Sequence, residues 1–255
     1  MMEKLSMRMI AVGMLACILL WAGAAELFQK PVIPSPVQVF FRLTATFTGT
    51  IAIHAAYSLM RITVGVLAAV AVGYPLGILM GYFRRVNHLL APILYLTYPI
   101  PKIALLPVVM LLFGVGETSK LLLVFLIIVF QVIVTVRDAV AAIPPATYFP
   151  LRVLGASFGQ MVRHIIVPAS LPKFITAVRV AMATAISVLF FTETFGTKYG
   201  IGYYIMDAWL RVNYLDMYAG IVVLSAIGLL LFILLDLAER RLCAWNRQYT
   251  VLGEY

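Results

Sequence analysis

The chain has 255 residues, of which 64% are hydrophobic and only 11% are charged. Soluble domains are about half apolar and about a quarter charged, so this composition excludes an ordinary soluble protein and predicts an all-α polytopic membrane protein. The net charge of +9 is explained more economically by basic cytoplasmic loops than by nucleic acid, which we do not expect as a partner. Cys17 and Cys243 lie far apart in the predicted topology, so no disulfide is expected.

About six apolar segments each approach the length of about 20 residues that a helix needs to cross a bilayer. We predict spans at residues 9–26, 54–82, 89–113, 119–142, 174–194 and 217–238. The first segment also fits a cleaved signal peptide, although an uncleaved first helix is favoured. No room remains for a large soluble domain, so one transmembrane domain is expected over 1–255, with its core at 54–238.

A short amphipathic segment is predicted to follow the first span, over 36–48. Ser35 before Pro36 is typical of a helix start, because serine caps the helix and proline fits its first position. Its apolar residues would lie on the outer interface. A plain surface loop is the alternative. Arg61, near the outer end of the second span, is expected to extend outward to the interface.

The third span is interrupted by Pro99, Pro101 and Pro107. Proline removes a backbone donor and kinks a helix, and a broken helix at membrane depth is tolerated only against protein or a water-filled cavity. A cation at the place of Lys102, near mid-span, is costly and usually functional. We therefore expect Tyr98, Pro99, Pro101 and Lys102 to line a translocation pathway, with Lys102 attracting an anion. Alternatively, Lys102 reaches the interface or pairs with a carboxylate.

The loop at about 143–173 carries the most informative pattern. It is polar, basic and stopped by prolines, so it cannot lie in lipid and must project into water. We expect a helical hairpin there that docks a soluble protein. The predicted docking residues are Leu154, Gly155, Ala156, Phe158, Met161, Ile165, Val167 and Pro168.

In the fifth span, Ala177, Ala181 and Ala185 form a groove for close helix approach, either within the subunit or in a dimer. Arg179 is expected to reach back to the cytosolic interface. Glu193 borders the end of this span and would line the pathway or cap a helix. The glycine-rich loop that follows is a candidate outer gate, or else an ordinary interfacial loop. The candidate gate residues are Gly200, Gly202 and Tyr203.

The sequence contains no phosphate-binding loop of the form GxxxxGK[ST] and no GxSxG or HExxH motif. His54, His88 and His164 are not spaced as metal ligands. We therefore expect no metal, no cofactor and no enzymatic activity in this chain itself.

Lysine and arginine are distributed asymmetrically between the two sides of the predicted bundle. With the N-terminus inside, one side receives eleven of them: Lys4, Arg8, Arg84, Arg85, Arg137, Arg152, Arg163, Lys173, Arg240, Arg241 and Arg247. Positive loops stay on the cytoplasmic side. Both termini and the docking loop are therefore predicted to be cytoplasmic.

These features, in this order, resemble the permease subunits of ATP-binding cassette importers, in the nitrate, sulfonate, taurine and bicarbonate group. The family signature reads EAA, three residues, G, nine residues, I, one residue, LP. Gly155, Ile165 and Pro168 fit it in register, with Val167 in place of leucine.

One departure from the signature is clear. The EAA positions hold Phe149, Pro150 and Leu151. Loss of the acidic residue removes a charged contact to the ATPase, so docking would use a partner with a compensating surface.

The resemblance implies a type I importer permease fold in the bacterial inner membrane. It also implies a second permease subunit, most simply a copy of this chain, two cytoplasmic ATPase subunits that bind ATP and Mg, and an external solute-binding protein. Alternating access would carry a small anion such as nitrate, a sulfonate, taurine or bicarbonate.

Two other functions stay open at this point. A stand-alone secondary transporter or channel would need intramembrane carboxylates, and the candidates Glu193, Asp138 and Asp236 lie at span ends. A membrane scaffold without a transport role would have no use for broken helices and a central lysine.

Overall fold

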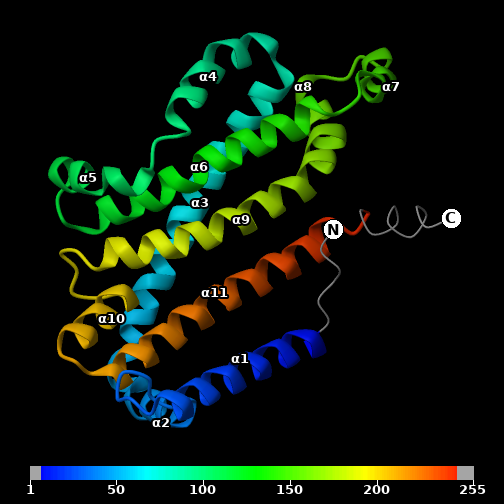
Figure 1. Ribbon diagram of the computed structural model, residues 1–255. Coiled ribbons are helices and arrows are strands. Elements are labelled where there is room, and N and C mark those ends of the chain that lie inside the picture. The colour runs from blue at the N-terminus through cyan, green and yellow to red at the C-terminus, as the bar shows by residue number, and fades with distance from the viewer. Residues whose placement is uncertain (1–6, 246–255) are drawn as a thin grey trace. The chain divides into compact units, whose positions relative to one another are not determined.

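The structure is a computed structural model that describes residues 7–245, in which we find helices and no strand (Figure 1). Within these residues five helical stretches are long and apolar enough to cross a membrane, and a sixth forms if one bent pair counts as a single span. The stretches are Ala11–Phe28, Pro36–Tyr82, Glu117–Ala141, Phe158–Glu193 and Tyr214–Leu242, and the bent pair is Arg84–Thr97 with Lys102–Phe113. The predicted all-α fold with about six spans is confirmed. Lys4 and Arg247, used above for orientation, lie outside the described residues.

The backbone divides into two compact units. One comprises Met1–Ser58 and Lys198–Ser225, and the other Leu59–Thr197 and Ala226–Tyr255. Two long helices, α3 (Ala52–Tyr82) and α11 (Tyr214–Leu242), contribute residues to both units.

In the first unit, α2 begins with a capping box. The elements that lie wholly in this first unit are α1 (Met7–Phe28), α2 (Pro36–Thr46), the π-helical turn η1 (Phe47–Ile51) and α10 (Ile201–Leu210). The Ser35 side chain accepts from Gln38 N, while the Gln38 side chain accepts from Ser35 N at 3.1 Å, which is a strong helix start. Val39 is buried, whereas Phe40 and Phe41 are exposed. The predicted amphipathic helix is confirmed, and the alternative of a surface loop is wrong.

In the second unit, α6 and α9 pack along each other and form the core (Figure 1). Apart from parts of α3 and α11, this unit contains, in chain order, α4 (Arg84–Thr97), η2 (Lys102–Leu105), α5 (Leu106–Phe113), α6 (Glu117–Ala141), η3 (Pro145–Tyr148), α7 (Phe149–Val153), α8 (Phe158–Met161), η4 (Val162–Ile166) and α9 (Val167–Glu193).

The fifth span starts earlier than its predicted position at residue 174. Helix α9 begins at Val167 and continues directly from η4 and α8. Pro168 does not end the helical stretch Phe158–Glu193, and it directly follows the π-helical turn η4. Proline and π-helical turns are the usual places where a helix kinks rather than ends. Ala177, Ala181 and Ala185 are all buried within this chain, which favours helix packing inside the subunit over a dimer contact.

A glycine ladder on α3 lets α6 approach closely. Each glycine faces a valine at the same separation along both helices, so α3 and α6 run parallel here. The pairs are Gly65 with Val124, Gly73 with Val132, Gly77 with Val136, and Gly81 with Val140. Small residues that permit such close approach are typical of membrane helix interfaces.

Gly81→Ala should destabilise the bundle, because the new Cβ would lie 2.6 Å from Cβ of Val140 and 2.7 Å from the carbonyl oxygen of Arg137. Overpacking of this kind costs about 1–3 kcal/mol. We expect a lower midpoint in thermal unfolding of the purified protein. Gly13→Ala is the matched control, since nothing lies within 4 Å of its added Cβ. Equal midpoints for the two variants would contradict the prediction.

Candidate translocation pathway and coupling hairpin

The interrupted third span breaks immediately after α4. The two halves of the span meet at a bend of 81°. In a continuous helix the carbonyl of Thr97 would accept from residue 101, but Pro101 has no N–H. The Nζ of Lys102 supplies the missing donor, bonding to Thr97 O at 2.6 Å and to Tyr98 O at 2.8 Å. Lys102 therefore caps the open helix end, where a cation is also favoured by the helix dipole.

The charge of Lys102 is compensated by aromatic rings. Its Nζ lies 4.8 Å from the ring centroid of Phe130 and 5.6 Å from that of Tyr98, within the range of a cation–π interaction. Among residues 7–245 no carboxylate forms an ion pair with Lys102. The alternative of a carboxylate partner is wrong for this structure.

Two cavities lie along α6 and α9. The first, of about 280 Å³, is lined by Tyr98, Pro101 and Lys102 from the break and by Phe130, Gln131 and Thr184 from the two helices. The second, of about 410 Å³, is lined by Gln131, Thr135, Lys173, Thr176, Val180 and Glu239. Three of the five predicted pathway residues thus share one cavity, whereas Pro99 and Glu193 line neither. Gln131, which lines both cavities, was missed because it lacks charge.

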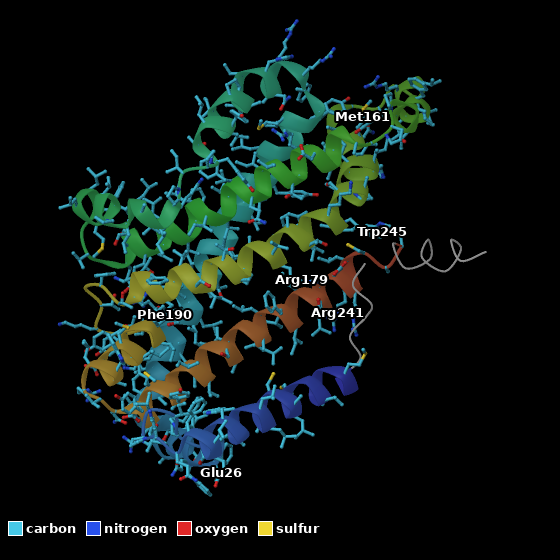
Figure 2. The ribbon with its side chains drawn as sticks, in the orientation of Figure 1. Glu26, Met161, Arg179, Phe190, Arg241 and Trp245 are labelled. Atoms are coloured by element: carbon cyan, nitrogen blue, oxygen red, sulfur yellow. The ribbon has the colours of Figure 1, made fainter. Side chains whose placement is uncertain are left out.

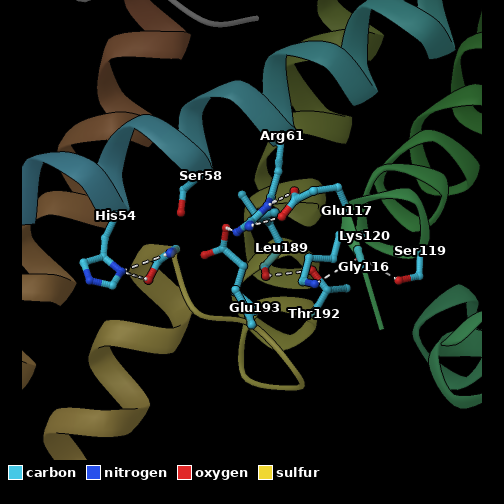
Figure 3. Close-up of polar contacts among 12 residues, drawn as sticks. His54, Ser58, Arg61, Gly116, Glu117, Ser119, Lys120, Leu189, Thr192 and Glu193 are labelled. Atoms are coloured by element: carbon cyan, nitrogen blue, oxygen red, sulfur yellow. Dashed lines mark hydrogen bonds and ion pairs between the residues drawn. The ribbon is translucent and has the colours of Figure 1, made fainter. Parts of the chain in front are cut away.

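An ion-pair network joins α3, the start of α6 and the end of α9, with Arg61 and Glu193 buried and Glu117 46% exposed (Figure 3). Arg61 donates from Nε and Nη2 to the two carboxylate oxygens of Glu117, both at 2.6 Å, and from Nη1 to Glu193 at 2.7 Å. The side chains of Arg61 and Glu193 are 1% and 0% exposed. Lys120 lies beside them and donates to the backbone oxygens of Val115 and Gly116.

This network corrects two predictions. Arg61 does not extend outward, because its guanidinium is buried and pairs with Glu193 and Glu117. Glu193 lines neither of the two cavities and is not a free helix cap, since its carboxylate is fully buried against Arg61. Arg179 likewise pairs with Asp236 at 2.5 Å and Glu239 at 2.7 Å, rather than simply reaching toward an interface (Figure 2 shows Arg179 on α9).

The predicted hairpin is present, and Gly155 makes its turn. Gly155 has φ +70°, a left-handed conformation that glycine adopts without strain. Its N–H donates to Arg152 O, and Ala156 N–H donates to Leu151 O, the pair of bonds that defines a Schellman helix end. Ser157 then starts α8 with a capping box.

The hairpin presents an apolar surface to solvent. The most exposed side chains are Val153, Leu154 and Phe149, at 86%, 80% and 56%. Leu154 and Phe158 are exposed as expected, and Ala156, Ile165, Val167 and Pro168 are half-buried. Phe149 and Val153 were not predicted as docking residues. Phe149 occupies an EAA position, and an apolar residue there was a visible signal.

Met161 is a correction to the predicted docking surface. It is 6% exposed, and its sulfur accepts from the hydroxyl of Tyr82 at 3.2 Å. It therefore cannot fill a groove on a partner.

An aromatic cluster ties the hairpin to the end of α3. Tyr82 lies 5.1 Å from Phe158 and 5.7 Å from Tyr148 between ring centroids, and Phe83 lies 5.0 Å from Phe158. Burial raises the pKa of the Tyr148 phenol, which stays neutral. The hairpin is therefore packed against the end of α3 through aromatic rings.

The glycine-rich segment in the first unit is held on α3. Nδ1 of His54 lies 3.1 Å from both the backbone N and O of Gly200, and Ser58 Oγ accepts from Ile201 N at 2.8 Å. Gly202 and Tyr203 belong to the first turn of α10, so only Gly200 of the three candidate gate residues is in the loop. The gate function itself stays a prediction.

Together, the broken span, the cavities and the exposed hairpin define a multi-pass membrane permease. Residues 73–243 match the family described as Binding-protein-dependent transport system inner membrane component. The chain is also 33% identical over 247 residues to the taurine transport system permease protein TauC of Escherichia coli (strain K12), covering 93% of this chain and 90% of that protein. The chain therefore belongs to the family of binding-protein-dependent transport system inner-membrane components.

Other similar proteins differ in the solutes for which they are named. SsuC of Bacillus subtilis (strain 168), named for aliphatic sulfonates transport, is 29% identical over 228 residues, covering 89% of this chain and 83% of SsuC. The formylaminopyrimidine transport permease protein ThiX of Halalkalibacterium halodurans is 27% identical over 235 residues, covering 92% and 94%. A chain of the MetNI methionine ABC transporter, in an inward-facing conformation, superposes with a TM-score of 0.61 at 20% identity, covering 73% of this chain and 91% of that chain. The importer permease fold is thereby confirmed.

Proposed function

We propose that this chain is the permease subunit of an ATP-binding cassette importer for a small sulfonate such as taurine. It acts as a single permease domain paired with a second permease, most simply a copy of itself. Two cytoplasmic ATPase subunits bind ATP and Mg, and an external binding protein delivers the solute. ATP-driven closure of the ATPases moves the hairpins and switches the pathway between outward and inward access.

The observation that carries this proposal is the exposed apolar hairpin over 149–158, tied by aromatic rings to α3. Exposed side chains of this size in a short surface turn are typical of a protein interface. Buried apolar surface stabilises a contact by about 25 cal/mol per Å². Phe149, Val153 and Leu154 can thus hold an ATPase groove without the acidic contact that the EAA positions lack. Both termini are proposed to be cytoplasmic, on the same side as the hairpin.

The sulfonate preference is supported by the relatives named for taurine and aliphatic sulfonates. Lys102 at the break in the third span is consistent with an anionic solute. Tyr98, Pro99 and Pro101 beside it form the proposed pathway wall, and Gly200, Gly202 and Tyr203 the proposed outer gate.

The experiment is the ATPase activity of the permease co-expressed with its ATPase and binding protein in lipid discs. We expect stimulation by taurine or an alkanesulfonate and none by a neutral solute. Nitrate and bicarbonate are tested in parallel to rank the anions. Stimulation by a neutral solute alone would reject the proposal that the transported solute is a sulfonate anion. Failure to assemble with any ATPase would favour a stand-alone secondary transporter.

A further inference from the structure

We propose that the cavity beside Lys102 is itself a binding site for one small sulfonate, held by Lys102, Gln131 and Thr184. This inference rests on the proposed function and deepens it, because it places a solute site inside the permease as well as in the external binding protein. The three residues come from the break after α4, from α6 and from α9 respectively.

The donors around this cavity are incompletely used. An ammonium group has three N–H donors. Lys102 donates two hydrogen bonds, to the carbonyls of Thr97 and Tyr98, which leaves one N–H for a ligand. Gln131 and Thr184 make no side-chain hydrogen bond within residues 7–245. Lipid offers such groups no partner. A sulfonate has three oxygens, which matches one donor from each side chain.

The remaining walls and the size of the cavity fit a short alkyl sulfonate. Ile127 and Val188 provide apolar surface, and the rings of Tyr98 and Phe130 flank the ammonium group. The volume of about 280 Å³ lies just below the range of roughly 300–1,000 Å³ that holds drug-sized ligands. It therefore suits a small solute.

Gln131 also connects the site to the second cavity. Thr176, Val180, Thr184 and Val188 follow one another at four-residue intervals along α9 and line one cavity or the other. Residues four apart are neighbours on a helix surface, so this strip of alternating threonine and valine extends about 18 Å at 1.5 Å per residue. Lys173 lines its other end. A sulfonate that leaves Lys102 would thus pass Gln131 toward a second cation.

The test is equilibrium binding of radiolabelled ethanesulfonate, a purely anionic sulfonate, to the full-length chain in lipid discs. We expect saturable binding that methanesulfonate displaces and that neutral dimethyl sulfone does not. Gln131→Glu, which brings a negative charge to the anion, and Thr184→Val, which removes only the hydroxyl, should each weaken binding by about tenfold, or about 1.4 kcal/mol. Lys102→Met should abolish it.

Two controls keep this outcome specific. Lys30→Met removes an exposed lysine outside both cavities. Ser187→Ala removes a hydroxyl whose only hydrogen bond within residues 7–245 goes to Ala183 O on its own helix. Neither should change the affinity. Because Lys102 also caps a helix, Gln131→Glu and Thr184→Val decide the result if Lys102→Met fails to fold.

The inference is overturned if the wild-type chain shows no saturable ethanesulfonate binding, or if both decisive variants bind like wild type. Either result is compatible with sulfonate-stimulated ATPase activity in the assembled transporter, in which case the proposed function stands alone. Conversely, ethanesulfonate binding that responds to the variants would support the site even if the assembled complex failed to respond to sulfonates. Only the proposed function would then be rejected.

Discussion

Arg61→Met is expected to lower the thermal stability of the protein strongly. Glu193 is fully buried and forms an ion pair with Arg61, which also pairs with Glu117. Removing one partner of a buried ion pair costs about 3–5 kcal/mol, because the remaining charge is left uncompensated. The measurement is the midpoint of thermal unfolding in detergent, followed by intrinsic fluorescence.

Two further variants separate loss of charge pairing from loss of packing. The double variant Arg61→Met with Glu193→Gln removes the buried charge together with its partner. Its midpoint temperature should therefore lie between those of Arg61→Met and the wild-type protein. Arg211→Met is the matched control, because Arg211 forms an exposed pair with Asp207 on α10 and such pairs contribute less than about 1 kcal/mol. If Arg61→Met shifted the midpoint no more than Arg211→Met, the network would have no stabilising role.

Gly155→Val is expected to uncouple ATP hydrolysis from transport while leaving the membrane helices folded. Gly155 has φ +70°, a conformation that costs an L-residue about 1–2 kcal/mol. This cost lowers the equilibrium constant for forming the hairpin turn by about tenfold. Nothing lies within 4 Å of an added Cβ, so the effect arises from the backbone and not from a clash. We expect the stimulation of ATPase activity by the loaded binding protein to fall by about that factor.

Gly155→Asn is the matched control, because asparagine tolerates the left-handed conformation better than other side chains. It should retain most of the stimulation. Wild-type stimulation in Gly155→Val would show that the geometry of the turn does not matter for coupling, whereas equal losses in both variants would point to side-chain bulk at the ATPase contact.

Much of the fold could be predicted from local features. The lengths of the apolar segments predicted the approximate spans. Ser35 followed by Pro36 predicted the start of α2, and the nearby prolines predicted the break before Lys102. These features act within a few residues, through proline and glycine stereochemistry and through helix capping. They can therefore be recognised in the sequence without knowledge of how the helices pack. The hairpin turn at Gly155 belongs to the same class.

The predictions that were wrong concern the direction of side chains. Arg61 finds its carboxylates 56 and 132 residues away, and no local pattern specifies such pairs. Met161 turns inward because Tyr82, on another helix, accommodates its sulfur. The site shared by Gln131 and Thr184 exists only because α6 and α9 lie together beside the break.

The sequence by itself thus determined the class of protein, the approximate spans, the broken third span and the hairpin, since hydropathy and backbone stereochemistry act locally. The tertiary structure alone decided which charges pair, how α3 lies against α6, and which side chains share a cavity. Those outcomes depend on the relative placement of helices distant in sequence, and that placement is fixed by their packing.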